Sequence, residues 1–462
     1  MDSTKASEPF RVPHAAQNPF ATPPLASPIG SIRSRRPESA VEAEPQAPAA
    51  RHRRRFQTSR LIGEFEKPWL HDTKRSPNWD TIIFYTCVVI ALAISGYICW
   101  HAYTDVPQHE YCLILDEDFK TLDTRVWNHE VQLGGYGTGS FDWTTDDPTN
   151  SYVDAEGLHI VPTLTLETTN ITAAQLWNGY TLNLTADGTC TSTTQRTSDE
   201  QTTNSNCAIR SNSTSGKIIN PVRSARLTTQ GKKSIKYGRV EVVAKLAKGD
   251  WLWPAIWMMP EDSVYGAWPR SGEIDIAESH GNDAETYPLG DNIVSSSLHW
   301  GTSYLDDAYE KSTGEWGAKR TKYGEGYHTF GLEWSEDYMF TWLDGRLRQV
   351  LYFNFKKNKN MWTYGKFADM SVNGTVPTDP WSQTGRDNTP FDQSFYLILN
   401  VAVGGTNGWF PDGSGGKPWV DDSKTSARDF YLGQSSWLPS WGTTESRSMI
   451  IKSVKMWQED PC

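Results

Sequence analysis

Cysteine is scarce in this chain, with 6 in 462 residues, and no pair has the CxxC spacing of a zinc or redox site. Histidine-rich tracts and long amphipathic helical patterns are also missing. These absences exclude a helical bundle, and no metal-ligand set is predicted. Long apolar segments are lacking apart from one run near residue 90, and glycine, asparagine, aspartate and proline separate short apolar stretches elsewhere.

An excess of positive charge is missing from most of the chain. Residues 1–80 hold 13 Lys and Arg against 9 Asp and Glu, which leaves 31 against 46, a net charge of -15, for the remainder. This acidic part disfavours nucleic acid or an anionic membrane surface as the main partner and is compatible with a neutral polysaccharide. The first 80 residues are rich in Pro, Ala, Ser and Arg, which predicts disorder.

The one long apolar run, Thr81–Trp100, carries no charge and has about the length that crosses a bilayer as a helix. Eighty residues precede it, which argues against a cleavable signal. Its N-terminal flank holds three basic residues and its C-terminal flank one, so the positive-inside rule predicts a single-pass type II protein. Three segments are expected, namely a cytoplasmic tail over 1–80, a signal-anchor helix over 81–103 and a lumenal or extracellular domain over 106–462.

Four glycosylation sequons lie beyond the apolar run and none before it. They are Asn170, Asn183, Asn212 and Asn373. Cys87 and Cys99 lie inside the run, which leaves four cysteines for an oxidising compartment and three ways to pair them. We favour Cys190–Cys207, which closes a polar insert, and Cys112–Cys462, which joins the first strand to the last.

Short strands dominate the pattern beyond residue 111. Arg239–Leu246 alternates apolar and polar residues, as in a strand with one buried face. Tyr327–Leu347 reads as two strands joined by a turn, and Phe395–Val403 is apolar enough for a buried central strand. We therefore predict an all-β sandwich.

The segment Ser271–Asn282, SGEIDIAESHGN, places three carboxylates in an apolar strand. Side chains alternate along a strand, so Glu273 and Asp275 share a face, whereas Glu278 would lie on the other. A β-bulge near Ile276–Ala277 would return Glu278 to the face of the other two. Like charges so placed repel, and a carboxyl pair with one ionised and one protonated member is what glycosidic bond cleavage requires.

Tryptophan is concentrated on both sides of this motif. Trp251–Pro260 (WLWPAIWMMP) and Trp268 precede it, and Trp300 follows it. Acidic residues along a strand usually form a solvated face, but such a face has no use for adjacent tryptophan. Indole rings with a few carboxylates suit sugar rings, which have apolar faces and polar edges.

The motif and its flanks resemble family 16 glycoside hydrolases, in the bulged form of laminarinases (endo-β-1,3-glucanases). RSARLTTQGKKSIKYGRVEVVAKLAKGDWLWPAIWMMP before the motif, and FYLILNVAVGGTNGWFPD after it, are similar to laminarinases and to invertebrate β-1,3-glucan-binding proteins. The resemblance covers about Glu110 to the C-terminus. It implies a concanavalin A-like jelly roll of two antiparallel sheets, with a glucan cleft across the concave one.

The resemblance also implies roles for single residues. Glu273 matches the nucleophile, Glu278 the general acid/base, and Asp275 the aspartate that hydrogen-bonds the nucleophile. The implied mechanism is retaining and needs no cofactor, and many relatives carry a structural calcium on the convex face, for which no ligand loop is assigned here. Candidate sugar-binding residues are Trp268, His299, Trp253, Trp257 and Trp409, although His299 could equally be a core histidine.

Two loop regions are expected to set specificity. The insert Glu167–Asn220 holds three sequons and the Cys190–Cys207 pair, which predicts an exposed glycosylated flap. Gly404–Trp441 carries four tryptophans, which either stack on sugars at the cleft rim or hold a long loop in place.

Two functions are compatible with these observations. The first is a hydrolase or transglycosylase acting on β-1,3-glucan, two activities that share their first half-reaction. The second is a glucan receptor without turnover, against which the three retained carboxylates argue. The anchored topology resembles fungal proteins associated with β-1,6-glucan assembly, which would add a role in wall remodelling.

Overall fold

The computed structural model describes residues 59–60, 62–71, 78–104, 109–192, 206–371, 374–460 and 462. Two compact units are distinguished, Met1–Ile94 and Ser95–Cys462. The tail predicted over 1–80 lies mostly outside the described residues, and so does the sequon at Asn373.

The apolar run forms a single helix, α2 (Trp79–Thr104), preceded by the short α1 (Pro68–His71). Helix α2 is long and apolar enough to cross a membrane. None of its side chains is buried within the protein. The helix begins and ends close to the predicted bounds, because a continuous apolar run without glycine or proline at its ends gives a clear signal.

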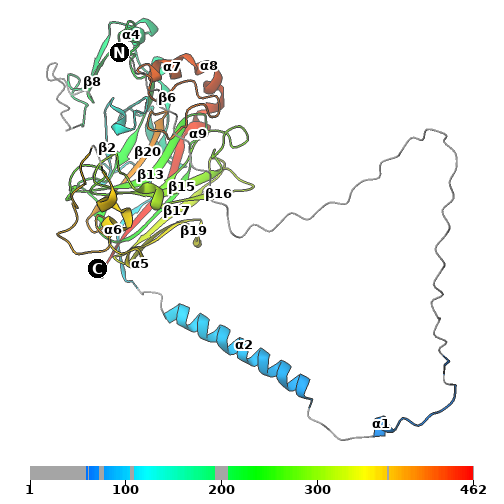
Figure 1. Cartoon of the computed structure of the whole chain (residues 1–462). Helices are drawn as coiled ribbons and strands as arrows, with labels where there is room; N and C mark the ends of the chain where they lie inside the picture. Colours follow the sequence, from blue (N-terminus) through cyan, green and yellow to red (C-terminus); the bar gives the residue numbers. More distant parts are fainter. Residues whose placement is uncertain are drawn as a thin grey trace, which may run out of the picture. The chain divides into compact units, whose positions relative to one another are not determined.

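Two antiparallel sheets of eight strands each form the domain beyond α2 (Figure 1). The first sheet has the order β19 (Gly345–Asn354), β18 (Tyr338–Leu343), β17 (His328–Trp334), β12 (Gly238–Lys245), β21 (Met449–Glu459), β5 (Gly157–Ile160) and β4 (Ser151–Asp154), with β1 (Tyr111–Glu117) paired to β21. The second has the order β16 (Thr313–Gly317), β15 (Ile293–His299), β14 (Glu273–Glu278), β13 (Leu252–Pro260), β20 (Phe395–Val403), β10 (Arg226–Thr228) and β2 (Asn128–His129), with β11 (Ser234–Ile235) paired to β20. The predicted sandwich is confirmed.

One hydrophobic core joins the inner faces of the two sheets. Strand β12 alternates buried and half-buried residues, so that Val240 and Val242 are fully buried, as predicted. Strand β20 lies between β13 and β10, and its Leu399 and Val401 pack into the same core. Successive side chains of a strand point to opposite faces of the sheet, so the residues between the core positions of the second sheet lie on its outer face. This outer face is available for a site.

Helices in this domain are short. Those described after α2 have four to seven residues, which agrees with the lack of amphipathic helical patterns. They are α3 (Thr165–Thr168), α4 (Ala173–Trp177), α5 (Phe355–Asn358), α6 (Met361–Gly365), α7 (Ser426–Leu432), α8 (Gln434–Trp437) and α9 (Thr444–Arg447). A small sheet of β3 (Asp142–Thr144), β9 (Val222–Ser224) and β6 (Thr163–Leu164) lies beside the large ones.

The described residues of the insert Glu167–Asn220, which we predicted to be an exposed flap, are mostly exposed or half-buried and also include regular structure. It contains α4 and a hairpin of β7 (Thr181–Asn183) and β8 (Ala208–Arg210), and Figure 1 shows α4 and β8 near α7 and α8, beyond the ends of the long strands. Its apolar residues form a second core that includes Leu176, Leu182 and Ile219. The sequence analysis did not predict this core, because its apolar residues are scattered among Thr, Ser and Asn.

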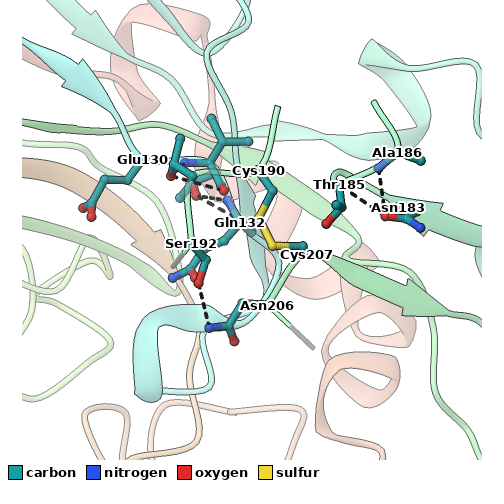
Figure 2. Close-up of a disulfide and its surroundings, with 12 residues drawn as sticks. Glu130, Gln132, Asn183, Thr185, Ala186, Cys190, Ser192, Asn206 and Cys207 are labelled. Atoms are coloured by element: carbon teal, nitrogen blue, oxygen red, sulfur yellow. Dashed lines mark hydrogen bonds between the residues drawn. A yellow bond between two sulfur atoms is a disulfide. The ribbon is translucent and has the colours of Figure 1, made fainter. Parts of the chain in front are cut away.

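Both favoured disulfides are present, Cys112–Cys462 and Cys190–Cys207. Figure 2 shows the second bridge closing a loop whose ends are also joined by a hydrogen bond of 3.1 Å from Asn206 Nδ2 to Ser192 Oγ. Of the described sequon residues, Asn170 and Asn212 are exposed. Asn183 is half-buried, and its Oδ1 accepts backbone N–H groups in the turn after β7 (Figure 2).

Candidate active site

Strand β14 contains the predicted bulge. Asp275 pairs with Ser297 of β15 and Glu278 with Ser295, so three steps along β14 correspond to two along β15. The ladder with β13 shows an irregularity at the same place. The extra residue brings Glu278 back to the face that carries Asp275, opposite the core.

Glu273 lies at the more open end of this row. Its side chain is half-buried, and Trp268 Nε1, on an indole that is 41% exposed, donates a hydrogen bond of 2.5 Å to Glu273 Oε2. Burial and repulsion from Asp275 raise the pKa of Glu273, whereas His299 and the Trp268 N–H act in the opposite direction. Because its side chain is in partial contact with solvent, Glu273 is the easier of the two glutamates to ionise.

Asp275 is 2% exposed and is paired with a histidine. His299 Nε2 lies 3.1 Å from Asp275 Oδ2, and His299 Nδ1 lies 2.5 Å from Asp307 Oδ2. Burial alone would lower the pKa of His299, but attraction to Asp275 and hydrogen bonds to both carboxylates raise it well above its usual value. The two carboxylates therefore favour the protonated form of His299, and its contacts place it beside the carboxylate row.

Glu278 lies at the closed end of the row. It is 8% exposed, and Trp253 Nε1 donates a hydrogen bond of 2.9 Å to Glu278 Oε1. Burial is the main cause that raises the pKa of Glu278 well above its usual value, followed by repulsion from Asp275 and Glu273. Glu278 is the carboxyl of this row that best retains a proton.

An arginine and an asparagine that we did not predict extend the same face. Trp257 Nε1 donates to Asn400 Oδ1 at 2.7 Å. The Arg226 guanidinium lies 4.6 Å from the Trp257 ring centroid and 3.9 Å from that of Tyr136, and it forms an ion pair with Glu130. One face of Trp257 is thus covered by a cation. The alternation of β10 and β20 was the signal that could have placed Arg226 and Asn400 on this face.

Trp409 does not have the position expected of a sugar-stacking residue. Its ring is stacked at 4.7 Å and 11° on Trp253 and at 4.3 Å and 4° on His280, and these two rings do not contact each other. Both faces of Trp409 are therefore covered within the protein. The other tryptophans of Gly404–Trp441 are buried and hold the loop, namely Trp419, Trp437 and Trp441.

One group of side chains has the spacing of a metal site. Donor atoms of Glu273, Asp275 and His299 lie within 4.8 Å of one another. The same His299 nitrogen that would bind a cation already faces Asp275, so the ion pairs account for this group without a metal.

Comparison with known proteins gives consistent results. The model of the family described as glycosyl hydrolases family 16 matches residues 185–391. A beta-1,3-glucan-binding protein from Penaeus monodon is 38% identical over 352 residues, 75% of this chain and 90% of the relative. A glucan endo-1,3-beta-glucosidase from Cryptopygus antarcticus is 37% identical over 193 residues, 41% of this chain and 59% of the relative.

Among solved structures, this chain is similar to the catalytic domain of an endo-1,3-beta-glucanase (laminarinase) from Thermotoga petrophila. The two are 22% identical, with a TM-score of 0.46, and the match covers 77% of this chain and all of that one. A likeness of that degree carries no functional argument. The match to 90% of the Penaeus monodon protein and a family model that spans the bulged strand show the family. This chain belongs to glycosyl hydrolase family 16.

Proposed function

We propose that this protein is an endo-acting hydrolase or transglycosylase of β-1,3-linked glucan that works through a covalent glycosyl-enzyme. The observation that carries the proposal is the bulge in β14, which brings Glu278 to the face of Asp275. An indole N–H donates to the glutamate at each end of the resulting row. The substrate class is supported by the names of the relatives, which refer to β-1,3-glucan binding or hydrolysis.

The reaction proceeds in two displacements. Glu273 attacks the anomeric carbon while Glu278 gives its proton to the leaving oxygen, so the glycosidic bond breaks and an ester to Glu273 forms. Glu278, now a carboxylate, then removes a proton from water or a sugar hydroxyl, which displaces Glu273. Esterification removes the charge of Glu273 and with it one cause of the raised pKa of Glu278, which suits Glu278 to act as a base in the second step.

Asp275 and His299 have a supporting role in this scheme. The His299 imidazolium offsets part of the negative charge of the row, and Asp307 holds the ring in place through Nδ1. With Glu278 protonated, the site has the same net charge before and after the first displacement. The reaction as proposed uses no cofactor, and a calcium ion on the convex face remains a prediction that a fall in melting temperature with a chelator would support.

The cellular arrangement is part of the proposal. Helix α2 would anchor the chain with its N-terminus in the cytoplasm, and the two disulfides are compatible with a domain in the secretory pathway or outside the cell. In sealed microsomes, glycosylation at Asn170 or Asn212 with protease-accessible residues before Trp79 would support this orientation. Unglycosylated sequons together with a protected N-terminus would contradict it.

A glucan receptor without turnover is the second candidate function. The observation that favours it is the 38% identity to a relative named for glucan binding rather than hydrolysis. Glu273 and Glu278 favour the enzyme over the receptor, because glucan binding alone does not require two carboxyls with different proton affinities.

The deciding experiment follows new reducing ends and product lengths when the full chain in detergent micelles is incubated with a linear β-1,3-glucan, beside Glu273→Gln. New ends that the variant does not produce would identify a hydrolase. Products longer than the starting chains without new ends would identify a transglycosylase. Binding without either product, on β-1,3-, mixed-linkage and β-1,6-glucan, would refute the enzyme and leave the receptor.

A further inference from the structure

A column of three stacked rings lies directly behind Glu278. His280, two residues after Glu278, stacks on Trp409 at 4.3 Å, and Trp409 stacks on Trp253 at 4.7 Å. His280 Nε2 is also 2.9 Å from the Trp409 carbonyl oxygen. Trp253 connects these rings to the general acid, because its Nε1 donates a hydrogen bond of 2.9 Å to Glu278 Oε1.

The local backbone explains why the three rings meet. Gly281 donates its N–H to the Leu252 carbonyl, which keeps the segment after β14 paired alongside the start of β13. Trp409 enters from the loop after β20, whose Gly404 N–H is bonded to the Trp251 carbonyl. Trp409 therefore inserts between two rings that are carried by adjacent strands.

The hydrogen bond from Trp253 has a chemical consequence for Glu278. An indole N–H only donates, and the carbonyl oxygen of a neutral carboxyl accepts a hydrogen bond better than its hydroxyl oxygen, so the Oε1 that accepts it is the oxygen without the proton. The proton of the neutral carboxyl is then assigned to Oε2, and the bond also fixes the direction in which Oε2 points. General acid catalysis depends on this direction, because the proton must lie within hydrogen-bond reach of the leaving oxygen.

We propose that His280 and Trp409 are positioning residues for the general acid: they hold the Trp253 indole so that its N–H selects the proton-bearing oxygen of Glu278. The inference rests on the proposed function and adds to it two residues that do not touch the reacting atoms. Burial lowers the pKa of His280 to about 4, so near neutral pH the column consists of uncharged rings with flat, closely spaced faces.

The proposal predicts a loss that depends on the leaving group. A sugar leaving group needs the proton of Glu278, whereas a dinitrophenolate departs without it. We compare kcat/KM for a β-1,3-gluco-oligosaccharide and for its 2,4-dinitrophenyl glycoside, since kcat/KM reports the steps up to formation of the ester. Trp409→Leu should lower the first value about 10- to 100-fold, within the ~10²–10⁴ that a general acid contributes, and should change the second less than about 3-fold.

Matched variants separate stacking from general loop support. Trp409→Phe and His280→Phe keep a flat ring in the column and should restore most of the activity on the oligosaccharide. Trp419→Phe is the control, because Trp419 bonds the Gly405 carbonyl and supports the same loop without joining the column. It should lower both kcat/KM values by a similar small factor.

If Trp409→Leu does not fold, His280→Leu removes the other supporting ring and takes its place. Trp253→Phe provides a second, independent test that removes the N–H itself and keeps a ring in the stack. It should reproduce the loss on the oligosaccharide and spare the dinitrophenyl substrate. Equal losses on both substrates in Trp253→Phe or Trp409→Leu, with an active wild type, would overturn the positioning role and leave the proposed function intact. A wild type that cleaves neither substrate would overturn the proposed function, and the positioning role with it.

Discussion

The two ends of β14 present the same pair of groups, a glutamate and an indole N–H, in different surroundings. At one end, half-buried Glu273 meets the exposed Trp268 at 2.5 Å. At the other, buried Glu278 meets Trp253, which has a second ring stacked behind it. The chemistry of the contact is alike, and the difference lies in access to water.

This difference agrees with the separate roles that we propose for the two carboxyls. Water stabilises an ionised group, so the more open glutamate is suited to attack as a carboxylate and the closed one to keep a proton. A bulge of one residue thus does two things, since it aligns the two glutamates on one face and places Glu278 where its side chain is buried.

The largest expected effect comes from removing each carboxyl in turn. Glu273→Gln should lower kcat/KM on the order of 10⁴-fold or more for every substrate, because it removes the covalent route. Glu278→Gln should lower it about 10²–10⁴-fold for an oligosaccharide but little for a dinitrophenyl glycoside. With the dinitrophenyl glycoside, we expect Glu278→Gln to release a burst of dinitrophenolate, and to form a glycosyl azide when azide is added. Equal behaviour of Glu273→Gln and Glu278→Gln would contradict the assignment.

His299→Gln tests the positive charge of His299, which acts on the glutamates at both ends of β14. The variant loses a positive charge that lowers the pKa of both glutamates, so both values should rise. Activity needs ionised Glu273, so the acid limb of the kcat/KM profile should move to higher pH, with a loss of about 10-fold near pH 5. His328→Gln, beside Asp344 on the other sheet, is the control and should leave the limb unmoved.

Trp268→Phe should have a smaller effect than loss of the buried bond at Glu278. Because water can replace the lost N–H at an exposed position, kcat/KM should fall only about 3- to 10-fold. The fall should be the same for the oligosaccharide and the dinitrophenyl glycoside, since both need the nucleophile. A fall confined to the oligosaccharide would assign Trp268 to the acid and would reverse the comparison.

Stability should also distinguish the closed end. A carboxyl whose pKa is raised by folding stabilises the protein below its unfolded value, and this contribution is lost as the pH rises. Gln at position 278 does not titrate, so the melting temperature of Glu278→Gln should exceed that of the wild type by about 1–2 °C at pH 8, corresponding to ~1 kcal/mol, and should match it near pH 4. Exposed Glu315→Gln is the control, and an equal gain there would refute the explanation.

Local patterns were sufficient to predict much of the fold. Strands β12 and β20 followed from alternation and from a continuous apolar run, and the bulge followed from the spacing of Glu273, Asp275 and Glu278. The second core beneath the insert Glu167–Asn220 was not predicted, because it is assembled from apolar residues that have no periodicity.

Contacts between distant segments were beyond sequence reasoning. His280 and Trp409 are 129 residues apart, and only the folded sheet shows that one supports the other. Asp307 lies in a loop eight residues after His299, where an aspartate ordinarily predicts a turn, and its role depends on the direction of one ring. Composition indicated a sugar site rich in tryptophan but could not tell which indoles face the cleft.

The bridge between Cys112 and Cys462 has a mechanical consequence. The polypeptide enters the domain through β1, which pairs with β21, so tension arriving from the preceding chain would peel β1 away one backbone bond after another. The bridge joins the start of β1 to the chain just after β21, which is held on its other side by β12. A pull is therefore shared by two adjacent strands, and the point where the chain enters the domain resists being opened by force.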